Sequence, residues 1–292
     1  MSKADPAGKS CLVTGAGTGL ARAMTLALLE AGADVLACDI DEAGLDATAA
    51  MAKAAGAPGR AIPHRLDVSD IVQCDAAVAR AVAEFGRIDV LVNCAGLGPV
   101  YMRRNFVAEP LRFWDADPVR WQRMIDVNIR GPFLLARAAA PAMLAQKWGR
   151  IVNITTSFST MIRAGNMPYG QTKSALEAGS ASWAGDLENT GVSCNVLIPG
   201  GAADTTMIPP DVMPDRSKLV PASAMAAPIR FLASPASDGV NGKRFVAQYF
   251  DPENPLAAPG CAPAAWPDLA AAASRGIGEE DANRGQAQAS NP

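Results

Sequence analysis

Short hydrophobic runs alternate along the first 250 residues with longer stretches in which apolar positions recur at helical spacing. Several of the short runs are almost entirely apolar, as expected for parallel strands covered on both faces. We therefore predict a parallel sheet formed by successive strand–helix–strand units. The predicted strands are residues 10–14, 35–39, a strand within 61–68, 89–93, 150–155, 192–198 and 244–248.

Capping residues and turn residues set the predicted helix boundaries. Asp117 followed by Pro118 is typical of a helix start, with the aspartate as N-cap and proline at the first helical position. Ser69 is expected to cap the helix after the third strand. The predicted helices run from about 18 to Gly32, from 117 to about 147 with kinks at Pro132 and Pro141, from about 168 to 190 before Gly191, and from Pro221 to about 233.

The chain changes character after Asp251, where it becomes rich in proline and alanine. It ends in a polar stretch that contains Glu279, Glu280 and Asp281. We predict a single domain over residues 1–250, and a partly irregular extension over 251–292 that packs on the surface or is partly disordered.

Composition narrows the class of protein. With 292 residues, of which 49% are hydrophobic, the chain has enough apolar material for a sizeable core. A net charge of −3 gives no reason to expect binding to nucleic acid or to an anionic membrane. The N-terminus lacks the apolar core of a signal peptide, and no apolar run approaches the roughly 18 residues of a spanning helix. We expect a cytoplasmic protein.

Cysteine and histidine limit the possible chemistry. The six cysteines are scattered without a C-x-x-C pair, which favours neither a disulfide framework nor a zinc site, so no metal is expected. His64 is the only histidine, so a Ser-His-Asp triad could use no other base. We expect His64 to lie at a strand end or in a loop, without a chemical role.

Tyr169 and Lys173 are four residues apart and therefore share a helix face. A free tyrosine titrates near pH ~10, so a neighbouring ammonium is needed to favour its ionised form at working pH. The hydroxyl cluster Thr155, Thr156 and Ser157 precedes this pair. Together these groups predict a general acid–base site.

A glycine-rich turn between the first strand and the first helix contains Gly15, Gly17 and Gly19. Such a turn lets backbone N–H groups approach a pyrophosphate at the helix N-terminus. Asp39 ends the second strand, where its carboxylate can accept from the adenosine ribose hydroxyls and repel a 2′-phosphate. Because no lysine or arginine lies in the turn or directly after Asp39, NAD is favoured over NADP.

These motifs, in this order, resemble the short-chain dehydrogenase/reductase (SDR) family over about residues 8–250. The resemblance implies a Rossmann-like, doubly wound α/β sheet of about seven parallel strands with helices on both faces. It implies that Asn128, Tyr169 and Lys173, with a hydroxyl from Thr156 or Ser157, form the catalytic group. The cofactor residues that it implies are Gly15, Gly17, Thr18, Gly19, Leu20, Asp39, Ile40, Asp67, Val68, Asn93, Ala95, Gly96, Tyr169, Lys173, Pro199, Gly200 and Thr205.

The chain departs from the family pattern at three places. The usual register for the serine falls on Thr156, with Ser157 one residue later. Thr205 follows Pro199 by six residues, one more than usual for the residue that contacts the nicotinamide amide. The segment 98–116 is longer than in the family, and either lines a substrate pocket or covers the sheet edge. It carries Tyr101, Arg103, Arg104, Phe106 and Trp114.

The resemblance implies an NAD-dependent oxidoreductase that acts on a secondary alcohol or ketone. Tyr169 would exchange a proton with the substrate oxygen, the Thr156 or Ser157 hydroxyl would hold that oxygen, Lys173 would stabilise the tyrosinate, and Asn128 would maintain a water relay. The alternatives are an NADP-dependent carbonyl reductase on the same fold and a non-catalytic nucleotide-binding regulator. Arg103, Arg104 and Arg163 are candidates for binding an anionic group of the substrate.

The two long helices at about 117–147 and 168–190 are predicted to form the interface of a homodimer or homotetramer. Ala175, Gly179, Ser182 and Asp186 form a small or polar strip on the second helix. Leu176, Trp183 and Leu187 add bulk nearby, unless they face the sheet instead. Paired long helices form the usual interface in the family that the chain resembles, and closed assemblies are common.

Overall fold

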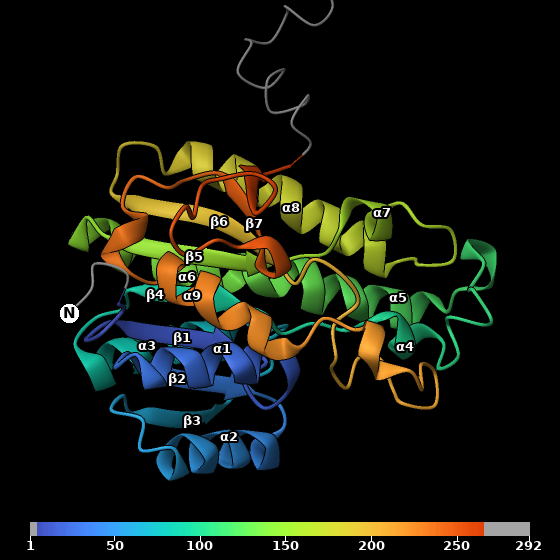
Figure 1. Ribbon diagram of the computed structural model, residues 1–292, viewed down its shortest axis with the longest axis horizontal. Coiled ribbons are helices and arrows are strands. Elements are labelled where there is room, and N and C mark those ends of the chain that lie inside the picture. Colours follow the sequence, from blue (N-terminus) through green and yellow to red (C-terminus); the bar gives the residue numbers. More distant parts are fainter. Residues whose placement is uncertain (1–4, 266–292) are drawn as a thin grey trace, which may run out of the picture.

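The structure, a computed structural model, describes residues 5–265. Its centre is an eight-stranded sheet of order β3-β2-β1-β4-β5-β6-β7-β8 (Figure 1). Strands β1 to β7 pair in parallel, and β8 pairs antiparallel with β7. The strands are β1 Ser10–Thr14, β2 Asp34–Asp39, β3 Ala61–Arg65, β4 Val90–Asn93, β5 Gly149–Ile154, β6 Val192–Ile198, β7 Lys243–Val246 and β8 Cys261–Pro263. The predicted parallel sheet is confirmed.

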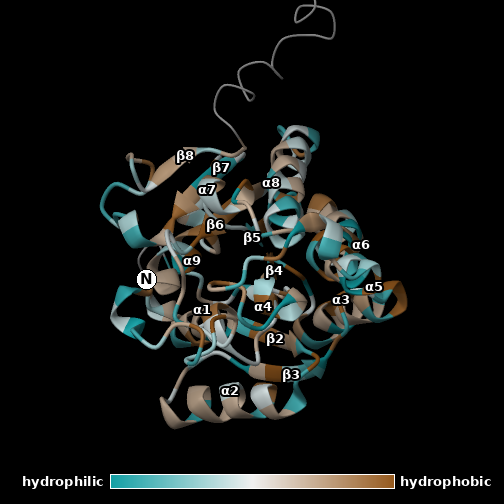
Figure 2. Cartoon of the chain, turned by 90° about the vertical axis from the view of Figure 1, so that its right-hand side faces the viewer, coloured by the Kyte–Doolittle hydropathy of each residue, from teal (hydrophilic) through white to brown (hydrophobic). Residues whose placement is uncertain are grey.

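Helices cover both faces of this sheet (Figure 2). Helices α1 and α9 pack together on one face, and α3 and α6 pack together on the other. The helices are α1 Gly19–Glu30, α2 Glu42–Ala54, α3 Ile71–Phe85, α4 Pro99–Met102, α5 Pro118–Ile125, α6 Gly131–Gln146, α7 Phe158–Met161, α8 Tyr169–Asp186 and α9 Ala226–Leu232. This arrangement confirms the predicted doubly wound α/β fold.

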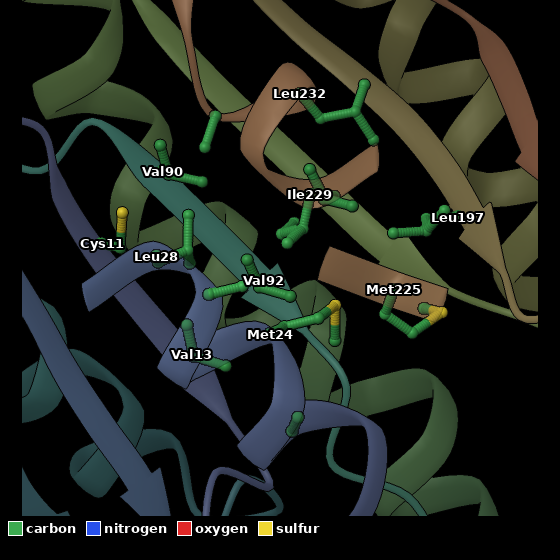
Figure 3. Packing of buried hydrophobic residues seen from close by; sticks show 14 of the residues in the cluster. Cys11, Val13, Met24, Leu28, Val90, Val92, Leu197, Met225, Ile229 and Leu232 are labelled. Carbon is green, nitrogen blue, oxygen red and sulfur yellow. The ribbon is translucent and has the colours of Figure 1, made fainter. Parts of the chain in front are cut away.

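The core is divided between the two faces because neighbouring residues of a strand point in opposite directions. Val13 of β1 belongs to one cluster, where Met24 of α1 and Ile229 of α9 also pack (Figure 3). Leu12 belongs to the cluster on the other face, together with Leu135 of α6. These five side chains are fully buried, and each large apolar side chain buried in this way contributes ~1.5–3 kcal/mol.

The cap of α3 differs from the prediction. Asp70, not Ser69, is the N-cap, and its carboxylate accepts from the backbone N–H groups of Val72 and Gln73. The Ser69 hydroxyl instead donates to Asp67 Oδ1 at 2.7 Å. Serine and aspartate are both good caps, so the sequence alone does not separate adjacent candidates. At α5 the predicted cap is confirmed, because Asp117 accepts from the first-turn N–H groups.

The helix predicted over 117–147 is divided. Helix α5 ends at Ile125, a π-helical segment spans Asp126–Arg130, and α6 begins at Gly131. Pro132 lies in the first turn of α6, where its ring would clash with the carbonyl four residues earlier in a regular helix. The wider π turn directly before Pro132 accommodates the ring. Pro141 lies inside α6 without ending it.

The C-terminal part of the sheet contains a strand that the sequence did not predict. Strand β8 extends the sheet beyond β7, with Ala262 opposite Arg244. Part of the predicted extension therefore belongs to the central sheet. The remainder, residues 266–292 with the acidic group at Glu279, Glu280 and Asp281, lies outside the described residues.

Candidate active site

One cavity of about 790 Å³ opens at the carboxyl ends of the parallel strands. Its walls come from the segments that follow β1, β2, β3, β4, β5 and β6, and from the start of α8. Ligands of open α/β sheets bind at this end of the strands, because the loops there converge where the crossover direction changes. The cavity is therefore the candidate active site.

Thr156, Tyr169 and Lys173 meet in the wall of this cavity. Tyr169 is the first residue of α8, and the Thr156 side chain, just beyond β5, hydrogen-bonds the phenol. Lys173 lies one turn along α8, with Nζ 6.0 Å from the centre of the Tyr169 ring. The ammonium donates to the carbonyl oxygen of Ile154 at 2.8 Å, which anchors it to the end of β5. The structure thus brings together the three side chains that the sequence proposed for acid–base chemistry.

The protonation of this pair differs from the prediction. Burial raises the pKa of Tyr169 to about 12, although the hydrogen bond from Thr156 opposes the rise. Burial also lowers the pKa of Lys173 to about 8. Neither group is a cause of the other's pKa shift, and the ammonium is held at the Ile154 carbonyl. The phenol is therefore protonated near neutral pH, which is the form that donates a proton.

Ser157 uses its side chain differently from Thr156. Its hydroxyl oxygen caps α7 by accepting from the backbone N–H of Thr160 at 3.3 Å. The same hydroxyl is 2.8 Å from Thr160 Oγ1 and 3.1 Å from Ser159 Oγ. Of the two predicted candidates, Thr156 is the one in contact with Tyr169.

Asn128 lies behind the cavity wall in the π-helical segment, and it is fully buried. Its Oδ1 accepts from the N–H of Leu97 at 2.7 Å, and its Nδ2 donates to the carbonyl oxygen of Leu97 at 2.9 Å. Nδ2 also donates to Thr172 Oγ1 at 3.0 Å. Asn128 therefore fastens the loop after β4 to the helix that carries Tyr169 and Lys173.

The glycine turn approaches neighbouring backbone closely. Gly15 and Gly19 have positive φ values of +77° and +54°, which favour glycine. A Cβ on Gly15 would lie 3.0 Å from the Cα of Ala95. Thr18, the N-cap of α1, makes no side-chain capping bond, so the first-turn N–H groups of α1 stay free of a capping side chain. This turn fits the pyrophosphate of a dinucleotide.

Asp39 lines the cavity at the end of β2. Its Oδ2 accepts from the N–H of Gly17 at 2.9 Å, which ties the carboxylate to the glycine turn. Arg22 reaches the same corner, but its guanidinium donates to the carbonyl oxygens of Gly17 and Gly44 and to Thr48 Oγ1. The Arg22 guanidinium, which is the basic group nearest in sequence to the glycine turn, is thus engaged by protein oxygens.

Most residues predicted to hold the cofactor border the cavity. They are Gly15, Thr18, Gly19, Leu20, Asp39, Ile40, Asp67, Val68, Ala95, Gly96, Tyr169, Lys173, Pro199, Gly200 and Thr205. Gly17 and Asn93 do not line it. The buried Asn93 donates instead to Asn153 Oδ1 at 2.8 Å, between β4 and β5. Thr205 lies over the glycine turn, because a Cβ on Gly19 would be 3.1 Å from its methyl carbon.

The cavity is also lined by residues outside the predicted cofactor set. Tyr101 and Phe106 of the segment 98–116 line the cavity, whereas Arg103, Arg104 and Trp114 do not. Arg163 lines it as the sequence proposed. Lining residues that the sequence did not single out include Ser159, Thr160, Asn166, Met207 and Ile208. Their only sequence signal is their place directly before Tyr169 or after Thr205, in loops whose path has no periodicity.

Comparison with known proteins agrees with this geometry. The model of the short chain dehydrogenase family matches residues 9–212. The 3-oxoacyl-(acyl-carrier-protein) reductase FabG of Thermotoga maritima is 31% identical over 244 residues, which is 81% of this chain and 94% of the relative. The 2-dehydro-3-deoxy-D-gluconate 5-dehydrogenase of Escherichia coli is 34% identical over 248 residues, which is 80% of this chain and 92% of the relative.

Solved structures give the same result. A metagenomic short-chain oxidoreductase in complex with NADP aligns with a TM-score of 0.65 and 30% identity, covering 78% of this chain and 91% of that chain. The fold, the site and these matches show that the chain belongs to the short-chain dehydrogenase family and is an oxidoreductase of that family. Within residues 5–265, no helix is both long and apolar enough to cross a membrane.

Proposed function

We propose that the protein is an NAD-dependent oxidoreductase that interconverts a secondary alcohol and a ketone. The observation that supports this most strongly is the contact between the Thr156 side chain and the Tyr169 phenol inside the cavity, with Lys173 one turn away. Tyr169 donates a proton to a ketone oxygen in reduction or accepts one from an alcohol in oxidation. Thr156 holds that oxygen by a second hydrogen bond, and Asn128 keeps the surrounding loop in place.

A nicotinamide dinucleotide, when bound, supplies the acceptor or donor of the hydride. The glycine turn would hold its pyrophosphate, and Asp39 would accept from the adenosine ribose hydroxyls. The negative charge of Asp39, together with the engagement of Arg22 by protein oxygens, supports NAD as the preferred form. NADP is the second candidate, because a structural relative is known in complex with it.

We also propose that the substrate carries an anionic group, such as a carboxylate. Arg163 lines the cavity and its side chain is exposed, and no ion pair to it occurs among residues 5–265. The lining residues in the segments 96–101, 157–169 and 199–208 include no aspartate or glutamate. A carboxylate there would gain a charge-assisted hydrogen bond. The E. coli relative is named for a sugar acid, which carries a carboxylate of this kind.

A substrate panel with a Tyr169→Phe control tests the proposal. Purified protein should oxidise hydroxy acids with NAD faster than the matching neutral alcohols. Because a general acid–base group contributes ~10²–10⁴-fold, the Phe variant should lose activity by about that factor while it still binds NAD. Absorbance of the reduced cofactor gives the rates, and calorimetry gives the binding. A Phe variant that kept more than about half of the wild-type turnover would contradict the assignment of Tyr169.

A further inference from the structure

A buried ion pair lies directly behind the acid–base group. Arg244 of β7 and Glu177 of α8 are paired, with side-chain exposures of only 5% and 0%. Glu177 follows Lys173 by one helical turn, so the pair touches the same helix that carries Tyr169 and Lys173. Neither Arg244 nor Glu177 is among the site residues that the family resemblance implies.

The ion pair is hydrogen-bonded to the two residues that precede Ser157, which are Thr155 and Thr156. The Arg244 guanidinium donates from Nη2 to the carbonyl oxygen of Thr156, and from Nη1 to Thr155 Oγ1 at 3.4 Å. The hydroxyl of Thr155 donates to Glu177 Oε2 at 2.6 Å. The Arg244 guanidinium also lies 4.2 Å from the centre of the Phe158 ring. The segment 155–158 is therefore held on both sides of Thr156.

The same pair reaches the added strand of the sheet. The backbone N–H of Ala265, two residues beyond β8, donates to Glu177 Oε1 at 3.2 Å. Both carboxylate oxygens of Glu177 are thus engaged, one by the hydroxyl segment and one by the segment after β8. This contact links the part of the chain that follows residue 251 to the acid–base helix.

Stability alone is a weak reason for such a pair. Taking two charges out of water costs several kcal/mol per ion, and apolar replacements of similar volume are often neutral or stabilising. Of the five protein contacts of this pair, one is to the carbonyl oxygen of Thr156 and three are to its near neighbours Thr155 and Phe158. A small displacement of a reacting group costs about 10²-fold in rate. A rigid support for Thr156 therefore has a large kinetic effect even where its net effect on stability is small.

We propose that Arg244 and Glu177 are positioning residues, which act through Thr156 by fixing its backbone carbonyl and the hydroxyl segment 155–158 against α8. The inference rests on the proposed oxidoreductase function. The segment that ends at Ala265 completes this support, so the pairing of β8 with β7 contributes to the geometry of the active site.

The test replaces both charges at once. The double variant Glu177→Leu/Arg244→Met leaves no unpaired buried charge, so it should fold. It should lose kcat by about tenfold to a hundredfold, with little change in the KM for NAD. In a Thr156→Val background the same pair of substitutions should cause little further loss, because groups that act as a unit are non-additive.

Arg150→Met is the matched control. Arg150 is a similarly buried arginine at the opposite end of β5, where it pairs with the exposed Asp238. Its loss should lower the melting temperature but leave kcat unchanged. If the double variant fails to fold, the Arg244→Lys variant tests the inference instead. A lysine keeps the positive charge but cannot contact Glu177 and the Thr156 carbonyl together. This variant should lose kcat at least threefold or so.

Two results would overturn the inference. One is a folded double variant, or a folded Arg244→Lys variant, with kcat within about twofold of the wild type. The other is a triple variant in which the fold-loss of kcat equals the product of the losses in the double variant and in Thr156→Val. That result would mean that the sites are independent, because the effects of independent sites add in free energy. Failure of the proposed function is separate, because it would appear as retained turnover in Tyr169→Phe.

Discussion

At the scale of single residues, Asp39 is the acidic residue that we propose to bind the adenosine ribose and to select NAD over NADP. Its carboxylate faces the cavity and is also tied to Gly17, so it is part of the glycine turn and not a freely solvated side chain. The sequence predicted its position at the end of β2 but could not predict the bond to Gly17. That bond depends on the turn folding back over the strand, which local patterns do not encode.

Substitution of Asp39 should change the choice of cofactor. In Asp39→Ala both the ribose contacts and the repulsion of a 2′-phosphate are lost, so the kcat/KM ratio of NAD to NADP should fall about tenfold or more, equivalent to ~1.4 kcal/mol. Asp39→Asn keeps an acceptor for the Gly17 N–H and removes only the negative charge, so it measures the effect of that charge on the ratio. Asp34→Asn, at the start of the same strand, should leave the ratio unchanged. Steady-state kinetics with both cofactors would refute the assignment by giving an unaltered ratio.

The roles of two buried charged residues could not be predicted from the sequence. Glu177 and Arg244 lie in a helix and a strand that were predicted correctly, yet neither was singled out. Each alone resembles an ordinary surface charge, because hydrophobic periodicity gives a face but no partner. Only the fold brings α8 and β7 together. Tyr169 and Lys173 were accessible to prediction because their spacing is local.

At the scale of elements, the short helix α7 distinguishes the two hydroxyl candidates. Ser157 is its N-cap, whereas Thr156 precedes the helix and contacts Tyr169. We predict that Thr156→Val costs far more activity than Ser157→Ala. The Ser157 variant should instead lose stability, by ~0.5–2 kcal/mol for a lost cap. Turnover numbers and urea unfolding of both variants check this, and equal or reversed losses of turnover would transfer the role to Ser157.

Element ends were predicted less well than element types. The strands were found at nearly their observed positions, because buried parallel strands are short apolar runs between turn residues. The cap of α3 shifted from Ser69 to Asp70, and the helix over 117–147 contained an unpredicted π segment. Strand β8 was missed, because an edge strand of three residues has too little pattern to read.

At the scale of the whole molecule, α5, α6 and α8 carry the surface that we predict for self-association. Leu176 and Leu187 are buried within the chain, so they are not available to an interface. A strip of small or polar residues on α8 remains accessible, and Phe133 of α6 is 48% exposed. The residues of this strip are Ala175, Ala178, Gly179, Ser182 and Asp186. Small side chains allow two helices to approach closely.

We predict a homodimer or homotetramer through this surface. Light scattering after size exclusion should give two or four times the chain mass of 30.2 kDa. Ser182→Arg should dissociate the assembly, because a long charged side chain separates the helices. Ala50→Arg, exposed on α2 away from this surface, should not. A wild-type monomer that is fully active at high micromolar concentration would rule the assembly out.

The two edges of the sheet have a consequence for solubility during folding and storage. An unpaired edge strand offers free N–H and C=O groups to another chain, which is a route to aggregation. Within residues 5–265 both edge strands are short and contain proline, Pro63 in β3 and Pro263 in β8. Proline lacks the N–H donor that a growing ladder requires. The added strand β8 therefore covers the edge of β7 with a strand on which further chains pair poorly.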